Sequence, residues 1–178
     1  ITSIDVSPLD TDIITAGTDD GNVWVTENGG ANWTKVSSNL PERWVTRVVC
    51  DPHDSETIYV TFSGLKWHDY LPHVFRSTDL GANWEDIGLD LPEVPVNDLI
   101  VDPLDRQRYW IATDLGVMES MDSGLSWHPL GEGMPVAIIN DLDFNNDSRR
   151  LLAATFARSM YSIQLPQIIT SSDQNDFQ

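Results

Sequence analysis

Three short turns in this sequence carry an aspartate or an asparagine at a fixed distance from a glycine and a tryptophan. They read TENGGANW from Thr26, STDLGANW from Ser77 and SMDSGLSW from Ser120. An aspartate that recurs beside a hydroxyl side chain could act as a general acid or base. It could equally accept hydrogen bonds from the backbone N–H groups of its own turn. The residue types therefore allow either catalysis or turn formation.

The first turn favours the structural role. Asn28 stands where the other two turns have an aspartate, and an amide keeps a hydrogen-bond acceptor but lacks the charge that an acid catalyst needs. The glycine supplies a backbone conformation that side chains disfavour, and the tryptophan can bury a large apolar surface. We therefore assign a turn-forming role to Asn28, Trp33, Asp79, Gly81, Trp84, Asp122, Gly124 and Trp127.

Three other carboxylates are weak candidates for catalysis. Asp19 and Asp20 follow a short apolar run in the first repeat, and Asp114 follows the corresponding run in the third. The sequence TDDG is also a common tight turn. Neither a catalytic triad nor metal-ligand spacing accompanies these residues. We therefore predict no metal and no other cofactor, and the acidic loops leave only weak Ca²⁺ binding open.

The second repeat contains an insertion, SGLKWHDYLPH, from Ser63 to His73. Its flat aromatic rings and hydrogen-bonding groups suit sugars, whose faces stack on rings and whose hydroxyls need directional partners. The alternative is an ordered loop whose aromatic side chains pack over the neighbouring sheet. The candidate binding residues are Trp67, His68, Asp69 and Tyr70, together with Arg158 from the last repeat.

These features belong to a repeat of about 40–50 residues. A turn of the type VDPLD or CDPHD precedes each tryptophan turn, and a degenerate fourth copy starts at Phe144. Short apolar and β-branched runs between Asp, Pro, Gly and Asn predict four strands per repeat. In the third repeat we expect strands at 97–101, 109–113, 117–120 and 127–130, with a turn over 102–108. Four short strands per repeat are typical of a propeller blade.

The sequence therefore predicts an all-β fold, a β-propeller fragment of about four blades. Each blade is a four-stranded antiparallel meander, and the last lacks its outer strand. The expected blades span about 1–44, 45–95, 96–137 and 138–166, followed by a polar C-terminal tail at 167–178. Because an open series exposes apolar sheet faces at both ends, we expect the remaining blades of a parent protein, a homodimer through these faces, or a compact four-blade closure.

The S-x-D-x-G-x-x-W turns resemble the Asp-box, or bacterial neuraminidase repeat (BNR), over nearly the whole chain. With the closing sequence ARSMYSIQL, the chain is similar to the C-terminal blades of large secreted bacterial proteins grouped with sortilin-like propellers and BNR-repeat glycoside hydrolases. Ala157 departs from the glycine usual in that ending. The resemblance implies a secreted, periplasmic or cell-surface bacterial location. It also implies a working face around the central axis, formed by the turns between second and third strands and by the links between blades.

The net charge of the chain excludes some classes of binding partner. Ten Lys and Arg against 28 Asp and Glu give a net charge of −18, which disfavours nucleic acid and anionic membranes. It also disfavours the anionic sugars of sialidases. We expect a non-catalytic binding or scaffold propeller domain of an exported protein that recognises a carbohydrate or protein ligand. The alternative is part of a xyloglucanase-like or sialidase-like glycoside hydrolase that uses Asp19, Asp20 or Asp114. Enzyme activity is left open, leaning towards none.

Overall fold

The computed structural model describes residues 1–131 and 133–167. Within them the chain forms four separate antiparallel sheets and one short 3₁₀ helix, η1 (Leu65–Trp67). In every sheet, strands that are consecutive in sequence lie side by side, so each sheet is a meander. The predicted all-β fold is confirmed. No helix in the described part of the chain is both long and apolar enough to cross a membrane.

Three of the sheets have four strands. The first contains β1 (Ser3–Val6), β2 (Ile13–Gly17), β3 (Val23–Glu27) and β4 (Thr34–Lys35). The second contains β5 (Trp44–Cys50), β6 (Ile58–Ser63), β7 (His73–Ser77) and β8 (Glu85–Asp86). The third contains β9 (Val96–Asp102), β10 (Asp105–Thr113), β11 (Gly116–Ser120) and β12 (His128–Pro129).

The fourth sheet has three strands in the described residues, as expected: β13 (Ile139–Asn145), β14 (Arg150–Thr155) and β15 (Met160–Gln164). Apart from its first residue, the predicted tail at 167–178 lies outside the described residues. The turn predicted over 102–108 is shorter than expected. Strands β9 and β10 pair again at Asp102 and Asp105, beyond an irregularity in the register before Tyr109.

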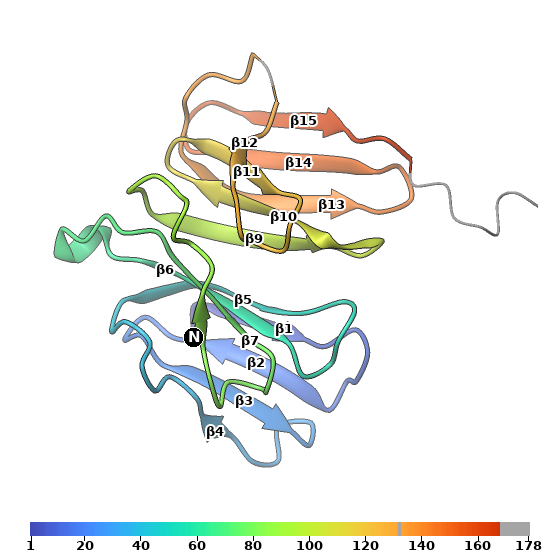
Figure 1. The fold of residues 1–178 in the computed structure, drawn as a ribbon. Coiled ribbons are helices and arrows are strands. Elements are labelled where there is room, and N and C mark those ends of the chain that lie inside the picture. Colours follow the sequence, from blue (N-terminus) through green and yellow to red (C-terminus); the bar gives the residue numbers. More distant parts are fainter. Residues whose placement is uncertain (132, 168–178) are drawn as a thin grey trace, which may run out of the picture.

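The first strands of successive sheets lie next to one another, β1 beside β5, β5 beside β9 and β9 beside β13 (Figure 1). This is the arrangement of propeller blades around an axis. The first and fourth sheets lie at opposite ends of the series (Figure 1), and among the described residues no apolar layer joins one to the other. The ring is therefore open, and the expected alternative of a compact four-blade closure is not adopted.

Apolar side chains fill the layers between successive sheets. The first layer joins Val23 and Val25 to Val45 and Phe62, the second lies between the second and third sheets, and the third lies between the third and fourth sheets. Each fully buried aliphatic or aromatic side chain in such a layer stabilises the fold by about 1.5–3 kcal/mol. The alternating pattern of the strands thus builds a core between sheets.

The tryptophan turns are held by hydrogen bonds among their own polar groups. The Asp79 carboxylate accepts hydrogen bonds from the Asn83 backbone N–H and the Ser77 hydroxyl, both at 2.8 Å, and Ser77 Oγ in turn accepts the Gly81 N–H at 2.8 Å. In the first turn the Asn28 amide oxygen accepts the Asn32 N–H at 2.8 Å. An amide therefore occupies the same place with the same bond, which supports the turn-forming interpretation.

The turn tryptophans also fasten one sheet to the next. The indole N–H of Trp84 donates to the Val36 carbonyl at 2.7 Å, and that of Trp127 donates to the Ile87 carbonyl at 2.9 Å. Each acceptor lies just after the last strand of the preceding sheet. Trp33 belongs to the first sheet, which has no preceding sheet in the structure. Its side chain is 39% exposed, against 4% for Trp127.

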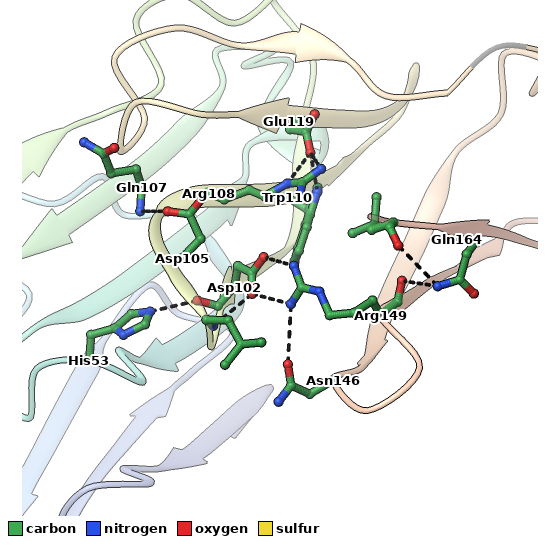
Figure 2. A network of polar contacts seen from close by, with 12 residues as sticks. His53, Asp102, Asp105, Gln107, Arg108, Trp110, Glu119, Asn146, Arg149 and Gln164 are labelled. Atoms are coloured by element: carbon green, nitrogen blue, oxygen red, sulfur yellow. Dashed lines mark hydrogen bonds and ion pairs between the residues drawn. The ribbon is translucent and has the colours of Figure 1, made fainter. Parts of the chain in front are cut away.

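A buried ion pair ties the third sheet to the fourth (Figure 2). It lies between the turns that join first and second strands, at the same end as the tryptophan turns. The Arg149 guanidinium donates to both carboxylate oxygens of Asp102, at 2.7 and 2.5 Å. The backbone carbonyl of Asp102 lies 2.8 Å from His53 Nε2 of the second sheet. Arg149 also lies 4.9 Å from the ring centroid of Phe144. One turn of the third sheet therefore holds both neighbouring sheets.

Candidate functional site

A pocket of about 450 Å³ lies at the opposite end of the sheets from the tryptophan turns. Because neighbouring strands are antiparallel, the start of each first strand and the end of each second strand meet at this end. Trp44 and Thr46 come from β5, Ser63 ends β6, Trp67 comes from η1, and Asn97 comes from β9 of the next sheet. We call this the Trp44–Trp67 pocket.

Two large aromatic side chains in the lining of this pocket are accessible to a ligand. Trp44 is 43% exposed and Trp67 is 42% exposed, although each ring is large enough to favour burial. The Thr46 side chain is held in place by hydrogen bonds, since its hydroxyl donates to the Val96 carbonyl at 2.7 Å and lies 2.7 Å from Thr61 Oγ1. The pocket therefore combines two accessible rings with a rigid floor.

Asn97 connects the floor to the neighbouring sheets. Its amide nitrogen donates to the Asp114 carboxylate at 3.0 Å and to the Ile139 carbonyl at 2.8 Å. Asp114, in the turn between β10 and β11, is thus a hydrogen-bond partner of a pocket-lining residue. It is the one of the three weak catalytic candidates that lies beside the pocket.

The insertion is folded around Asp69. The Asp69 carboxylate accepts from Arg43 Nε and lies 3.0 Å from His73 Nε2, with the bond from Arg43 also at 3.0 Å. Desolvation raises the pKa of Asp69, but the bonds from His73, from the Leu71 N–H and from Arg43 outweigh it and lower the pKa. Asp69 therefore stays charged and anchors the loop to the link before β5.

Two cations lie against the ring of Trp67. The Arg43 guanidinium carbon is 5.6 Å and the Lys66 ammonium is 5.5 Å from the ring centroid. Since Arg43 is itself held by Asp69, the carboxylate positions the tryptophan through the arginine. The cation–π contact adds attraction to this arrangement.

The other predicted binding residues lie around or away from the pocket. His68 ends η1 in the left-handed conformation, with a φ of 59°, and Tyr70 is 48% exposed on the same insertion. Neither lines the Trp44–Trp67 pocket. Arg158 stands in the turn between β14 and β15, where its backbone N–H donates to Thr155 Oγ1 at 3.1 Å. The structure therefore brings Trp67 and Asp69 together and leaves Arg158 on the fourth sheet.

Asp19 and Asp20 lie in the turn between β2 and β3. The Asp20 carboxylate accepts from Asn22 Nδ2 at 2.7 Å and from the Thr18 hydroxyl, and the bond from Thr18 lowers its pKa. No hydrogen bond in the described residues joins Asp114 to this turn. The three weak candidates thus belong to turns of two different sheets.

The sequence did not lead us to predict a cluster of charged side chains on the first strands of the sheets. The Arg47 guanidinium pairs with the Asp98 carboxylate at 2.5 and 2.6 Å and also pairs with Asp141. Burial raises the pKa of Asp98, and the bonds from Arg47 oppose this rise. The signal was present in the sequence, because Arg47 and Asp98 are charged residues in the interior of the largely apolar strands WVTRVVC and VNDLIVD.

The site offers binding groups more readily than reacting ones. Its rings, amide and hydroxyls can contact a ligand, and its nearest carboxylates, Asp69 and Asp114, already accept hydrogen bonds. Within residues 1–131 and 133–167, no three His, Cys, Asp or Glu side chains gather where they could hold a metal ion.

Comparisons with known proteins give the fold. No family model matches the chain, and no curated protein matches it. The GH74 enzyme of Niastella koreensis matches over 92% of this chain with 14% identity and a TM-score of 0.71. The GH74 xyloglucanase of Xanthomonas campestris matches over 87% with 18% identity and a TM-score of 0.66. YCF48, solved bound to D1 peptide, matches over 94% with 18% identity and a TM-score of 0.69.

The chain corresponds to only part of each matched protein. The chain spans 28% and 26% of the two GH74 chains and 52% of the YCF48 chain. An extracellular domain of a hybrid two-component system from B. thetaiotaomicron also matches, over 92% of this chain, with 18% identity and a TM-score of 0.67. Identities this low concern architecture and not activity. The likeness establishes that the four sheets have the arrangement of β-propeller blades.

Proposed function

We propose that this chain is a non-catalytic binding domain, built of Asp-box (BNR) repeats, in an exported sortilin-like protein, and that its ligand is a neutral glycan. The observation that carries the proposal is the pair of half-exposed tryptophans, Trp44 and Trp67, beside one cavity of about 450 Å³. The proposed blades are about 1–44, 45–95, 96–137 and 138–166, and the proposed location is secreted, periplasmic or at the bacterial cell surface.

The chemistry of the pocket favours a sugar. Pyranose C–H faces pack on indole rings, while Ser63, Lys66 and Asn97 in the lining supply polar partners for hydroxyl groups. Trp67 is held in place by Arg43 and Asp69. Such preorganisation lowers the entropy cost of binding.

A protein ligand is the alternative occupant. YCF48 has been solved bound to D1 peptide, and exposed tryptophans with neighbouring cations also suit aromatic or acidic peptide side chains. The glycan is preferred because two exposed indole rings with polar side chains beside them suit the stacking and hydrogen bonding of a sugar.

The GH74 likeness also favours a second candidate, part of a glycoside hydrolase. Asp114 would then be the carboxylate at the ligand, because it lies one hydrogen bond from the pocket through Asn97. Such an enzyme needs a second carboxylate roughly 5–10 Å away. Asp19 and Asp20 stand in another sheet, and Asp20 is engaged with Thr18 and Asn22. Binding without turnover is therefore the stronger proposal.

Calorimetric titration with xyloglucan oligosaccharides tests the proposal. Trp67→Ala should weaken binding about 10- to 100-fold, since a stacked aromatic side chain contributes about 1.5–3 kcal/mol. The matched control is Trp33→Ala, because Trp33 is 39% exposed on the opposite end of the sheets. Its affinity should equal that of the unaltered protein.

Three results would overturn the proposal. One is the absence of binding to any neutral oligosaccharide at millimolar concentration, and another is an equal loss of affinity in the Trp33→Ala control. The third is release of reducing ends that Asp114→Ala abolishes, which would establish the hydrolase instead. Binding of peptides alone would identify the protein-ligand alternative.

A further inference from the structure

Equivalent positions on the first strand of each sheet make the contacts between sheets. The strand register aligns Ser3, Arg47, Asp98 and Asp141 with one another, since they pair with Gly17, Thr61, Ala112 and Ala154 of the second strands. Two residues further on, the same register aligns Asp5, Val49, Ile100 and Asp143. We call these the first and second inner positions.

Side chains at these positions accept backbone N–H groups from the next sheet. Ser3 Oγ accepts the Val48 N–H at 3.1 Å, and Asp5 Oδ2 accepts the Cys50 N–H at 2.8 Å. In the third sheet, Asp98 Oδ2 accepts the Leu142 N–H at 2.7 Å. These donors point away from their own sheets, so an acceptor on the preceding sheet satisfies groups that would otherwise be left unpaired.

The fourth sheet alone carries carboxylates at both inner positions. Asp141 pairs with Arg47, but its side chain remains 59% exposed. Asp143 is exposed, and its carboxylate makes no hydrogen bond or ion pair with any described residue. On the same face of this sheet lie the half-buried Leu152 and the exposed Met160. This face thus has the carboxylate of Asp143, the second oxygen of Asp141 beyond the one that Arg47 contacts, and an apolar surface beside them.

The first sheet presents the complementary donors. In the antiparallel pair of β1 and β2, Ser7 N–H donates to the Ile13 carbonyl. Backbone N–H groups alternate in direction along a strand, so those of Ile4 and Val6 point away from β2. In the strand register, Ile4 and Val6 of the first sheet are equivalent to Val48 and Cys50 of the second. The side chains of Ile4 and Val6 are 60% and 46% exposed, so the surrounding surface is apolar.

We propose that the open face of the fourth sheet receives β1 of a second copy of this chain, with Asp143 and Asp141 accepting the Val6 and Ile4 N–H groups. The contact reproduces the bonds that already join the first sheet to the second. It is a head-to-tail interface, with different surfaces on the two partners. It covers the apolar faces that the open ring leaves at both of its ends.

Sedimentation velocity of the full chain tests this inference, in about 0.15 M salt so that the net charge of −18 is screened. The unaltered chain should reach at least twice its 20.0 kDa in a concentration-dependent way. Asp143→Lys should return it to one copy, because a cation cannot accept the N–H. The matched control is Asp147→Lys, at an exposed position in the turn before β14, and it should associate normally.

A mixing experiment identifies the head-to-tail geometry. Ile4→Lys damages only the donor face, so Ile4→Lys and Asp143→Lys should each be single copies when alone. Mixed together, they retain one intact donor face and one intact acceptor face, and they should form a pair. A single-copy mass for the unaltered chain at about 100 µM would overturn the proposal, because it would mean a dissociation constant on the order of millimolar or weaker. So would association that survives Asp143→Lys, or a mixture that stays single.

Discussion

Arg149 and Asp102 form a two-bond ion pair, at 2.7 and 2.5 Å, in which both side chains are almost completely withdrawn from water, with 1% and 0% exposed. The pair joins the fourth sheet to the third (Figure 2), at the end of the strands opposite the Trp44–Trp67 pocket. Removing one partner leaves the other as an uncompensated buried charge. This fastening should therefore be among the most sensitive positions of the fold.

Asp102→Asn should lower the free energy of unfolding by about 3–5 kcal/mol, the cost of an unpaired buried charge. Urea denaturation measures it, with the exposed Asp147→Asn as a control that should change it by less than about 0.5 kcal/mol. The double variant Asp102→Leu with Arg149→Met should recover most of the loss, because no buried charge remains. Equal losses in Asp102→Asn and the control would contradict this account.

Gly81→Ala should destabilise the protein more than Gly30→Ala does. Both glycines occupy the same place in their turns, with φ of 90° and 92°, so both substitutions strain the backbone. A Cβ at Gly81 would lie 2.6 Å from Val36 Cβ of the preceding sheet, whereas at Gly30 the nearest atom is 3.8 Å away. Overpacking costs about 1–3 kcal/mol, which thermal unfolding should show as a difference between the two. Equal effects would contradict the close approach of the sheets.

The third turn should contribute to stability in mild acid. The hydroxyl and backbone N–H of Ser126, with the hydroxyl of Ser120, lower the pKa of Asp122 from 3.8 to about 2. A carboxylate with a lowered folded-state pKa adds stability above its unfolded pKa and loses it as the pH falls through the folded one. The melting temperature should therefore fall between about pH 4 and pH 2, and Asp122→Asn should flatten that fall. An unchanged profile in Asp122→Asn would refute the assignment.

Asp69→Ala should weaken the binding of xyloglucan oligosaccharides without altering the pocket lining. Its loss frees Arg43 and with it Trp67, and ordering one side chain costs about 0.5–1.5 kcal/mol, or roughly two- to tenfold in affinity. Asp69→Glu should restore part of the affinity, which a purely structural role would not predict. Calorimetry measures both, and an affinity equal to that of the unaltered protein would show that Asp69 does not position the ring.

The periodicity of the sequence predicted the sheets well because the evidence is local. Strand alternation and turn residues such as Gly81 and Asp79 act within a few residues, so they indicate a meander without knowledge of the neighbours. The start of β10 was misplaced because Asp105 pairs with Asp102 beyond an irregularity, and polar residues gave no sign of a strand there. The insertion was found by its aromatic composition. Trp44, which lines the same pocket, was not among the predicted binding residues.

The sequence by itself determined the repeat and the number of strands in each sheet, because hydrophobic alternation and turn chemistry repeat in fixed order. Only the tertiary structure decided that Trp44 and Trp67 share a pocket, that Arg47 spans Asp98 and Asp141, and that Arg149 pairs with Asp102. These pairs join residues of different strands and mostly of different sheets. Contacts across such separations depend on how the sheets are placed around the axis, and no local pattern encodes that placement.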